Sequence, residues 1–173
     1  MLFDEDQQPD TAFVAIPEVS SGNRRYIPID FMMPDTVVGN KIRLLENAEL
    51  YDFGVLTSNV HMAWMRTTCG YYGPSYQYSI NIVYNNFPWP SPTEEQKQRI
   101  EQTAQGILDA RNLYPDSSLA DLYDPLTMPV ELRKAHTAND KAVMQAYGMP
   151  IKETDEAACV AWLMRLYQEV TSK

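Results

Sequence analysis

The stretch Tyr76-Gln-Tyr-Ser-Ile-Asn-Ile-Val-Tyr-Asn-Asn-Phe-Pro-Trp-Pro-Ser-Pro92 divides the chain into two parts of different character. From Tyr78 to Tyr84, large apolar residues occupy every second position, and this period of two predicts a strand with one buried face. The alternating prolines that follow are incompatible with a sheet interior and favour an extended backbone. We expect Phe87 and Trp89 to pin this extended segment, residues 87–92, here called the strap, onto a neighbouring surface.

Before the strap, the sequence predicts short strands separated by loops. The strand candidates are Phe13–Ile16, Tyr26–Phe31 and Leu50–Leu56, each bounded by turn-forming residues or proline. The polar turn at 20–23 would join the first two strands into a hairpin with a polar, cationic tip. Only Val60–Thr68 shows helical spacing in this part of the chain.

After the strap, nearly every residue fits a helix. Ser91, Pro92 and Glu94 mark a helix start, and the helix they open should run to about Asn112. A short helix capped by Ser117 or Ser118 and two longer helices follow, each with an apolar stripe that can pack against its neighbours. The sequence therefore predicts an α+β fold in which an irregular β-rich part is followed by a small helical bundle.

Composition limits the classes of function. The formal net charge is −9, and the two halves are both acidic, with 5 Lys and Arg against 10 Asp and Glu in residues 1–90, and 9 against 13 in residues 91–173. An autonomous electrostatic grip on nucleic acid is therefore not expected, although one wall of a larger basic cleft remains possible. No window approaches the roughly 18 consecutive apolar residues of a membrane helix. Two distant cysteines and no leader pattern predict a reduced, cytoplasmic protein without a membrane association.

The sequence carries no self-contained active site. His61 and His136 are the only histidines, and no Cys-x-x-Cys or His-Glu pairing accompanies them, so no metal site is predicted. The sequence has no Gly-x-Gly-x-x-Gly motif and no Walker loop, which would cradle a nucleotide or a related cofactor. Asn85-Asn86-Phe87-Pro88 differs in order from the Asn-Pro-Pro-aromatic loop of amino-methyltransferases and is not expected to catalyse that reaction. Cys69 and Cys159 are expected to be inert core residues.

Several long stretches together resemble one protein family. One of them reads Phe53-Gly-Val-Leu-Thr-Ser-Asn-Val-His-Met-Ala-Trp-Met-Arg66. The others are Ala15–Ser21, Arg25–Ile29, Tyr84–Pro90, Ile107–Arg111, Ser118–Pro129 and Glu131–His136. In this order they resemble the C-terminal end of the large bacterial DNA methyltransferases of the MmeI-like restriction–modification type, over essentially the whole chain.

The resemblance implies that residues 1–90 belong to a DNA target recognition domain and residues 91–173 to a helical C-terminal domain. It also implies a parent enzyme that transfers a methyl group from S-adenosylmethionine to adenine N6, with or without an N-terminal nuclease. The cofactor and the catalytic loop would then belong to an upstream methyltransferase domain. This chain by itself would hold no cofactor, would lack catalytic residues, and would contact double-stranded DNA in the context of the parent enzyme.

Within that resemblance, phosphate contacts need cations and hydroxyls, whereas base edges need amides or arginines. Phosphate-binding candidates are Ser20, Ser21, Arg24 and Arg25, and base-edge or stacking candidates are Arg66, Tyr71, Tyr72 and Gln77. Related proteins often begin the latter loop with a Gly-Arg-Leu-like sequence, where this chain has Gly70-Tyr71-Tyr72, so its base specificity does not follow from the family. Each candidate also has an ordinary reading: a solvated turn, an arginine paired with an acid, or core tyrosines.

A second function remains open at this point. An acidic chain with an aromatic, proline-strapped surface also suits a non-enzymatic protein-interaction module. Salt-dependent binding to duplex DNA favours the recognition domain, whereas salt-insensitive binding to another polypeptide favours the interaction module.

Overall fold

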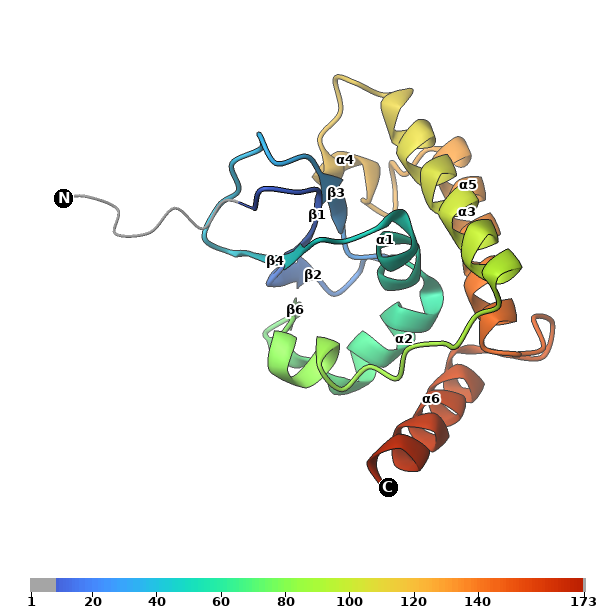
Figure 1. Ribbon diagram of the computed structural model, residues 1–173. Coiled ribbons are helices and arrows are strands. Elements are labelled where there is room, and N and C mark those ends of the chain that lie inside the picture. Colours follow the sequence, from blue (N-terminus) through green and yellow to red (C-terminus); the bar gives the residue numbers. More distant parts are fainter. Residues whose placement is uncertain (1–8, 173) are drawn as a thin grey trace.

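The computed structural model describes residues 9–172 and has the predicted α+β architecture. Two small antiparallel sheets lie on one side of the molecule, and the long helices α3 (Glu94–Asn112) and α5 (Val130–Ala146) lie on the other (Figure 1). Two shorter helices, α1 (Leu50–Leu56) and α2 (Asn59–Thr68), fill the space between them. Within residues 9–172, every helix is too short or too polar to span a bilayer.

The first sheet has the order β3-β1-β4, and all its pairings are antiparallel. Its central strand β1 (Phe13–Pro17) is almost completely buried, which confirms the first predicted strand. The neighbours are β3 (Asp30–Met32) and β4 (Ile42–Glu46). The strand predicted over Tyr26–Phe31 is wrong except at its end. Its first residues form a turn in which the Ile29 N–H donates to the Ile27 carbonyl at 2.8 Å, and they pack into the core, where they contact helices instead of a neighbouring strand.

The second sheet has the order β2-β6-β5, formed by β2 (Val19–Ser21), β5 (Gly70–Tyr72) and β6 (Ser75–Gln77). Glu18 is the corner between the two sheets: its N–H donates to the Lys41 carbonyl at 2.9 Å, and its carbonyl accepts from the Tyr78 N–H at 2.7 Å. Residues 13–21 thus form one bent segment that contributes a strand to each sheet, β1 to the first and β2 to the second. The expected hairpin with a cationic tip is wrong, because β2 pairs with β6 across a long sequence separation.

The predicted strand Leu50–Leu56 is instead helix α1. A reciprocal capping box stabilises its start, in which the Glu49 N–H donates to the Asp52 carboxylate at 2.7 Å. A short apolar run fits a buried helix as well as a buried strand, and period alone does not separate the two. Gly54 lets this helix approach α3 closely, since a Cβ at this position would lie 2.7 Å from Ile100 Cγ2.

The predicted strand Tyr78–Tyr84 is also wrong. After β6 the chain turns into a short π-helix, η1 (Ile80–Tyr84), which the Asn85 N–H closes on the Ile80 carbonyl at 2.9 Å. The Asn86 side chain adds hydrogen bonds of 3.0 Å to two carbonyls of this turn, so local side-chain bonding competes with the strand. Trp64 Nε1 donates to the Val83 carbonyl at 2.9 Å and anchors the turn on α2.

The strap lies on the surface of the helices as predicted. The Phe87 ring is buried and packs edge-on against His61 and Trp89, with ring centroids 4.6 and 5.6 Å apart. Tyr147, at the end of α5, donates a hydrogen bond of 2.8 Å to the Pro88 carbonyl. These contacts confirm that Phe87 and Trp89 hold the strap, which carries the chain from η1 to the start of α3 (Figure 1).

The helices predicted after the strap are confirmed, with corrections at their starts. Helix α3 begins at Glu94 with Thr93 as its cap, two residues after the expected cap Ser91, and Gln96 completes the capping box. Ser118 caps the short α4 (Leu119–Leu122) as predicted. The last helix, α6 (Glu156–Thr171), is capped by Asp155, packs on α2, and projects from the body of the molecule (Figure 1).

One continuous hydrophobic core runs through both parts of the chain, from β1 through α1 and α2 to α3 and α5. A buried arginine reinforces this junction: Arg111 on α3 donates to the Asp30 carboxylate at 2.9 Å and to the Ile29 carbonyl at 2.7 Å. Its guanidinium also donates to the Tyr123 hydroxyl and lies over the Phe53 ring. The strap therefore joins two parts of the sequence that share one interior.

Candidate nucleic-acid interface

The β2-β6-β5 sheet gathers most of the predicted site residues. Val19 pairs with Gln77 and Ser21 with Ser75, while Tyr72 on β5 also pairs with Ser75. Because residues directly opposite each other across strands point to the same side, these five side chains share one face, here called the outer sheet face. Burial agrees: the Tyr72 side chain is 80% exposed and Val19 is 43% exposed, whereas the alternate residues Ser20 and Tyr76 are buried.

Tyr71 belongs to the opposite side of the sheet but remains largely exposed. Its ring packs edge-on against Tyr76 at 5.6 Å, and its hydroxyl donates to the Arg66 carbonyl at 3.0 Å. Neither Tyr71 nor Tyr72 is a core residue, which removes the ordinary reading that the sequence left open for them. Tyr72 projects into solvent without a ring partner among the described residues.

A clamp fixes the loop after β2 against the β5–β6 turn. The Gly22 N–H donates to the Pro74 carbonyl at 2.9 Å, and the Tyr76 hydroxyl donates to the Gly22 carbonyl at 2.9 Å. A Cβ on Gly22 would stand 2.3 Å from the Pro74 oxygen, so the approach requires glycine. Ser21 and the residues that follow are therefore held beside the tip of the β5–β6 hairpin.

The predicted cations lie at the margin of this sheet. Arg24 donates from Nη1 to the Ser20 hydroxyl at 3.4 Å and from Nη2 to the Ala120 carbonyl at 3.3 Å. The side chain of Arg25 is 65% exposed and lies 3.9 Å from the Asp140 carboxylate, a long ion pair that leaves most of the guanidinium accessible. Two of the four phosphate candidates, Ser21 and Arg25, thus have exposed side chains.

Arg66 is engaged within the chain. Its Nη1 donates to the Glu156 carboxylate at 3.1 Å, its Nη2 donates to the Arg25 carbonyl, and its side chain is 20% exposed. These bonds tie α2 to α6 and to the loop before Tyr26. The ordinary reading of Arg66, an arginine paired with an acid, therefore describes its contacts in this structure.

Gln77 lies at the edge of a pocket of about 510 Å³ that the sequence reasoning missed. The pocket sits below the sheet corner and is also lined by Glu18, Arg43 and Asn81. Arg43 on β4 forms an ion pair with Glu18. Arginine and asparagine side chains suit base edges as well as Gln77 does, so both become candidates. No sequence signal linked Arg43 to Gln77, because the bend at Glu18 brings the two strands together.

The histidines and cysteines have structural roles. His61 Nε2 lies 2.8 Å from the Tyr78 hydroxyl, and complete burial lowers the His61 pKa to about 3. His136 Nε2 lies 2.6 Å from the Tyr123 hydroxyl in the core, and burial lowers its pKa. Burial also raises the pKa of the Cys69 thiol, which disfavours the reactive thiolate. Among residues 9–172, no cluster of His, Cys, Asp or Glu is suited to hold a metal ion.

Comparison with known proteins decides the family. The family model described as "MmeI, target recognition domain" matches residues 1–91, and the model described as "MmeI, C-terminal domain" matches residues 92–173. The chain belongs to the MmeI family. The resemblance noted in the sequence is thereby confirmed.

A curated relative and a solved structure support the same family assignment. DNA methyltransferase A of Bacillus subtilis (strain 168) is 39% identical over 160 residues, which are 92% of this chain and 18% of that protein. The solved structure of the Type IIL restriction–modification enzyme MmeI in complex with DNA superposes with a TM-score of 0.91 at 47% identity. That match covers 96% of this chain and 22% of the MmeI chain, so this MmeI-family chain spans about a fifth of each relative.

Proposed function

We propose that this chain is the DNA-recognition portion of an S-adenosylmethionine-dependent, adenine-N6 DNA methyltransferase of a restriction–modification system. The observation that carries the proposal is the outer sheet face, where an exposed aromatic ring, an amide and a hydroxyl lie together, with Arg24 bonded to β2 at the margin of the sheet. This combination supplies both phosphate contacts and base-edge contacts on one rigid element. Membership of the MmeI family, with its target recognition domain, supports the same assignment.

Each side chain has a role that follows from its position. Ser21, Arg24 and Arg25 would hold phosphates and set the register of the protein on the duplex, whereas Ser20, which is buried, would position Arg24 through its hydroxyl. Gln77 would donate and accept at a base edge, as amide side chains do with adenine. Tyr72, which is 80% exposed on the outer sheet face, would stack on a base or wedge between base pairs, and Tyr71, exposed on the opposite side of the same hairpin, is a second stacking candidate.

A second set of proposed DNA contacts lies in the pocket beside Gln77. Arg43 and Asn81 would extend the base-reading surface from Gln77 into the neighbouring pocket. Arg66 would contribute to DNA recognition by positioning its neighbours, because its guanidinium holds the Arg25 carbonyl and the Glu156 carboxylate at the start of α6. The clamp at Gly22 would keep all these groups in register.

We place catalysis outside this chain. The sequence has no Gly-rich cofactor loop and no Asn-Pro-Pro-aromatic loop, so S-adenosylmethionine and the adenine would be held by an upstream methyltransferase domain of the parent enzyme. The net charge of −9 fits this division, because the required positive potential would come from that domain. We place the protein in the cytoplasm, where its DNA substrate and its cofactor are found.

The same reasoning divides the chain at the strap. We propose that residues 1–90 form part of the target recognition domain and residues 91–173 the helical C-terminal domain. The shared core and the buried Arg111 would make the two parts unfold together, so the division describes evolutionary origin and contact roles more than independent folding units.

The test is the affinity of the 173-residue chain for duplex DNA, measured by fluorescence anisotropy over a series of low salt concentrations. Because the chain is acidic overall, we expect weak binding at the lowest salt concentrations only, which falls as salt rises and which the variant Arg24→Ala/Arg25→Ala loses. A matched control, Lys152→Ala/Arg165→Ala, removes the same charge elsewhere and should retain most of it. Equal losses in the two variants would show a non-specific charge effect, and salt-insensitive binding to a polypeptide instead of DNA would favour the interaction module.

A further inference from the structure

The most cationic part of this acidic chain lies far from the outer sheet face. A groove of about 610 Å³ follows the outer side of α5 beside α3, and the cations that line it are Arg99, Arg133, Lys134 and Lys141. No acidic residue lines the groove. The chain has 14 Lys and Arg in all and a net charge of −9, so a groove lined by four cations and no acid is positively charged on a protein that is negatively charged overall.

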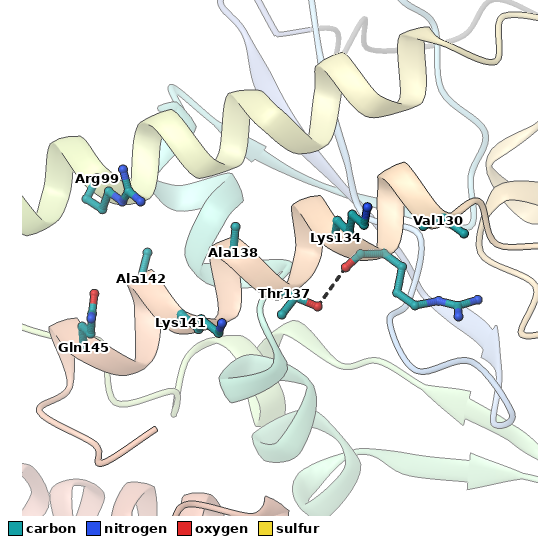
Figure 2. Close-up of a pocket in the computed structure, with 9 residues that line it drawn as sticks. Arg99, Val130, Lys134, Thr137, Ala138, Lys141, Ala142 and Gln145 are labelled. Carbon is teal, nitrogen blue, oxygen red and sulfur yellow. Dashed lines mark hydrogen bonds between the residues drawn. The ribbon is translucent and has the colours of Figure 1, made fainter. Parts of the chain in front are cut away.

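Helix α5 separates its charges by face. His136, Asn139 and Asp140 point inward and are buried, with Asp140 bonded to the Tyr26 hydroxyl at 2.6 Å. The opposite side of the helix carries residues at helical spacing that are exposed to solvent, among them Lys134, Ala138 and Lys141. Figure 2 shows Lys134, with the small side chains Ala138 and Ala142, on the side of α5 that faces Arg99 of α3. The cations therefore flank a low, apolar floor.

None of these cations forms an ion pair within the described part of the chain, although the Glu131 carboxylate interacts electrostatically with Lys134. The ion pairs formed by residues 9–172 involve other side chains. Arg133 donates only a long hydrogen bond of 3.3 Å, to the Met128 carbonyl. The nearest acid on α5, Glu131, accepts a hydrogen bond of 2.7 Å from Tyr114 and does not line the groove. Four charges are thus available to a partner.

We propose that the α3–α5 groove docks an acidic helical segment of polypeptide, a function that goes beyond DNA recognition. The groove extends from Val130 to Gln145, which is about 22 Å or four helical turns. An alanine and valine floor lets a helix approach closely, and flanking cations match carboxylates on its two sides. Such a segment would come from another part of the parent enzyme, a source that rests on the proposed function, because this chain spans only about a fifth of the length of its relatives.

Duplex DNA fits the groove less well. Figure 1 places α3 and α5 at the side of the molecule away from β2 and β6, so one straight duplex would not reach both the groove and the outer sheet face. Phosphate binding also has no use for the exposed Val130 and the alanine floor between the cations. An acidic amphipathic helix uses both features.

The experiment uses the 173-residue chain and a synthetic peptide of about 16 residues, long enough to span the groove, built from alanine with glutamates on the two sides of one alanine face and no two glutamates three or four residues apart. Fluorescence anisotropy compares the native chain with Lys134→Glu/Lys141→Glu and with the control Lys41→Glu/Lys152→Glu, which makes the same charge change at exposed sites elsewhere. We expect salt-dependent binding that the groove variant weakens at least about tenfold and the control weakens much less.

Three results would overturn the proposal: no binding of the glutamate peptide by the native chain, equal binding by both variants, or groove reversal that weakens duplex DNA binding while leaving the peptide unaffected. The last result would assign the groove to phosphate. A lysine version of the peptide should not bind. If the glutamate variant fails to fold by circular dichroism, Lys134→Gln/Lys141→Gln replaces it and should weaken peptide binding in the same direction.

Discussion

Arg111 offers the sharpest test of how the two parts of the chain are held together. Its side chain is 6% exposed, and replacing it with methionine keeps the apolar stem while removing every donor. The substitution would break the ion pair of 2.9 Å with Asp30 and the hydrogen bond of 2.7 Å to the Ile29 carbonyl. It would also remove the donor to the Tyr123 hydroxyl and the cation over the Phe53 ring.

The magnitude follows from burial. Removing one partner of a buried ion pair costs about 3–5 kcal/mol of unfolding free energy, because the remaining charge is left unpaired. Asp30 is 25% exposed at its side chain and keeps a hydrogen bond from the Phe31 N–H, so water will recover part of that loss. We therefore expect Arg111→Met to destabilise the protein by about 3 kcal/mol, a large share of the about 5–15 kcal/mol typical of a domain.

The assay is urea unfolding of the 173-residue chain, followed by tryptophan fluorescence and by circular dichroism. With a slope of about 2 kcal/mol per molar urea, the midpoint should fall by about 1.5 M. A double-mutant cycle with Asp30→Asn should give a coupling free energy above about 1 kcal/mol. A loss below about 1 kcal/mol for Arg111→Met, or no coupling, would refute the view that this pair ties the helical part to the first sheet.

Two further predictions concern the interior. Gly54→Ala should lower the free energy of unfolding in urea by about 1–2 kcal/mol, because the new Cβ would stand 2.7 Å from Ile100 Cγ2. Gly106→Ala, where a Cβ meets open space, should raise it by up to about 1 kcal/mol. The opposite order would contradict the close packing of α1 on α3. Burial raises the Asp140 pKa to about 6 from 3.8, so the folded protein binds this proton more tightly than the unfolded chain, and the resulting stability is present below about pH 4 and lost as the pH rises to about 6. Between pH 4 and 6 the native chain should lose about 2 kcal/mol of unfolding free energy that Asp140→Asn does not lose, so its melting temperature should fall relative to that of the variant; parallel melting temperatures across this range would contradict the shift.

The helical half was predictable because its signals are local. Ser118 is one of the two expected caps of α4, and the apolar stripe expected in the helix that follows is its buried face, with Leu132 and Val143. The error at the start of α3, where Thr93 and not Ser91 is the cap, arises because neighbouring polar residues compete for that position.

The first half was harder because its elements depend on distant contacts. The alternation at 78–84 gives way to a π-helix that Trp64 and two asparagines stabilise, and the apolar run at 50–56 becomes a helix because Gly54 fits against α3. Of the candidate site, the exposed Ser21 and Tyr72 and the half-buried Gln77 came from sequence and meet on one sheet. The neighbouring Arg43 was missed, because only the bend in the segment formed by β1 and β2 brings it near.

The most direct test of the proposed recognition surface is amide hydrogen exchange of the chain with and without saturating duplex DNA. We expect slower exchange in residues 19–25 and 70–77, the segments that carry the outer sheet face and the two arginines, with little change in residues 130–145. Protection confined to residues 130–145, or no protection of the β2-β6-β5 sheet under conditions where DNA is bound, would contradict the assignment of DNA recognition to this sheet.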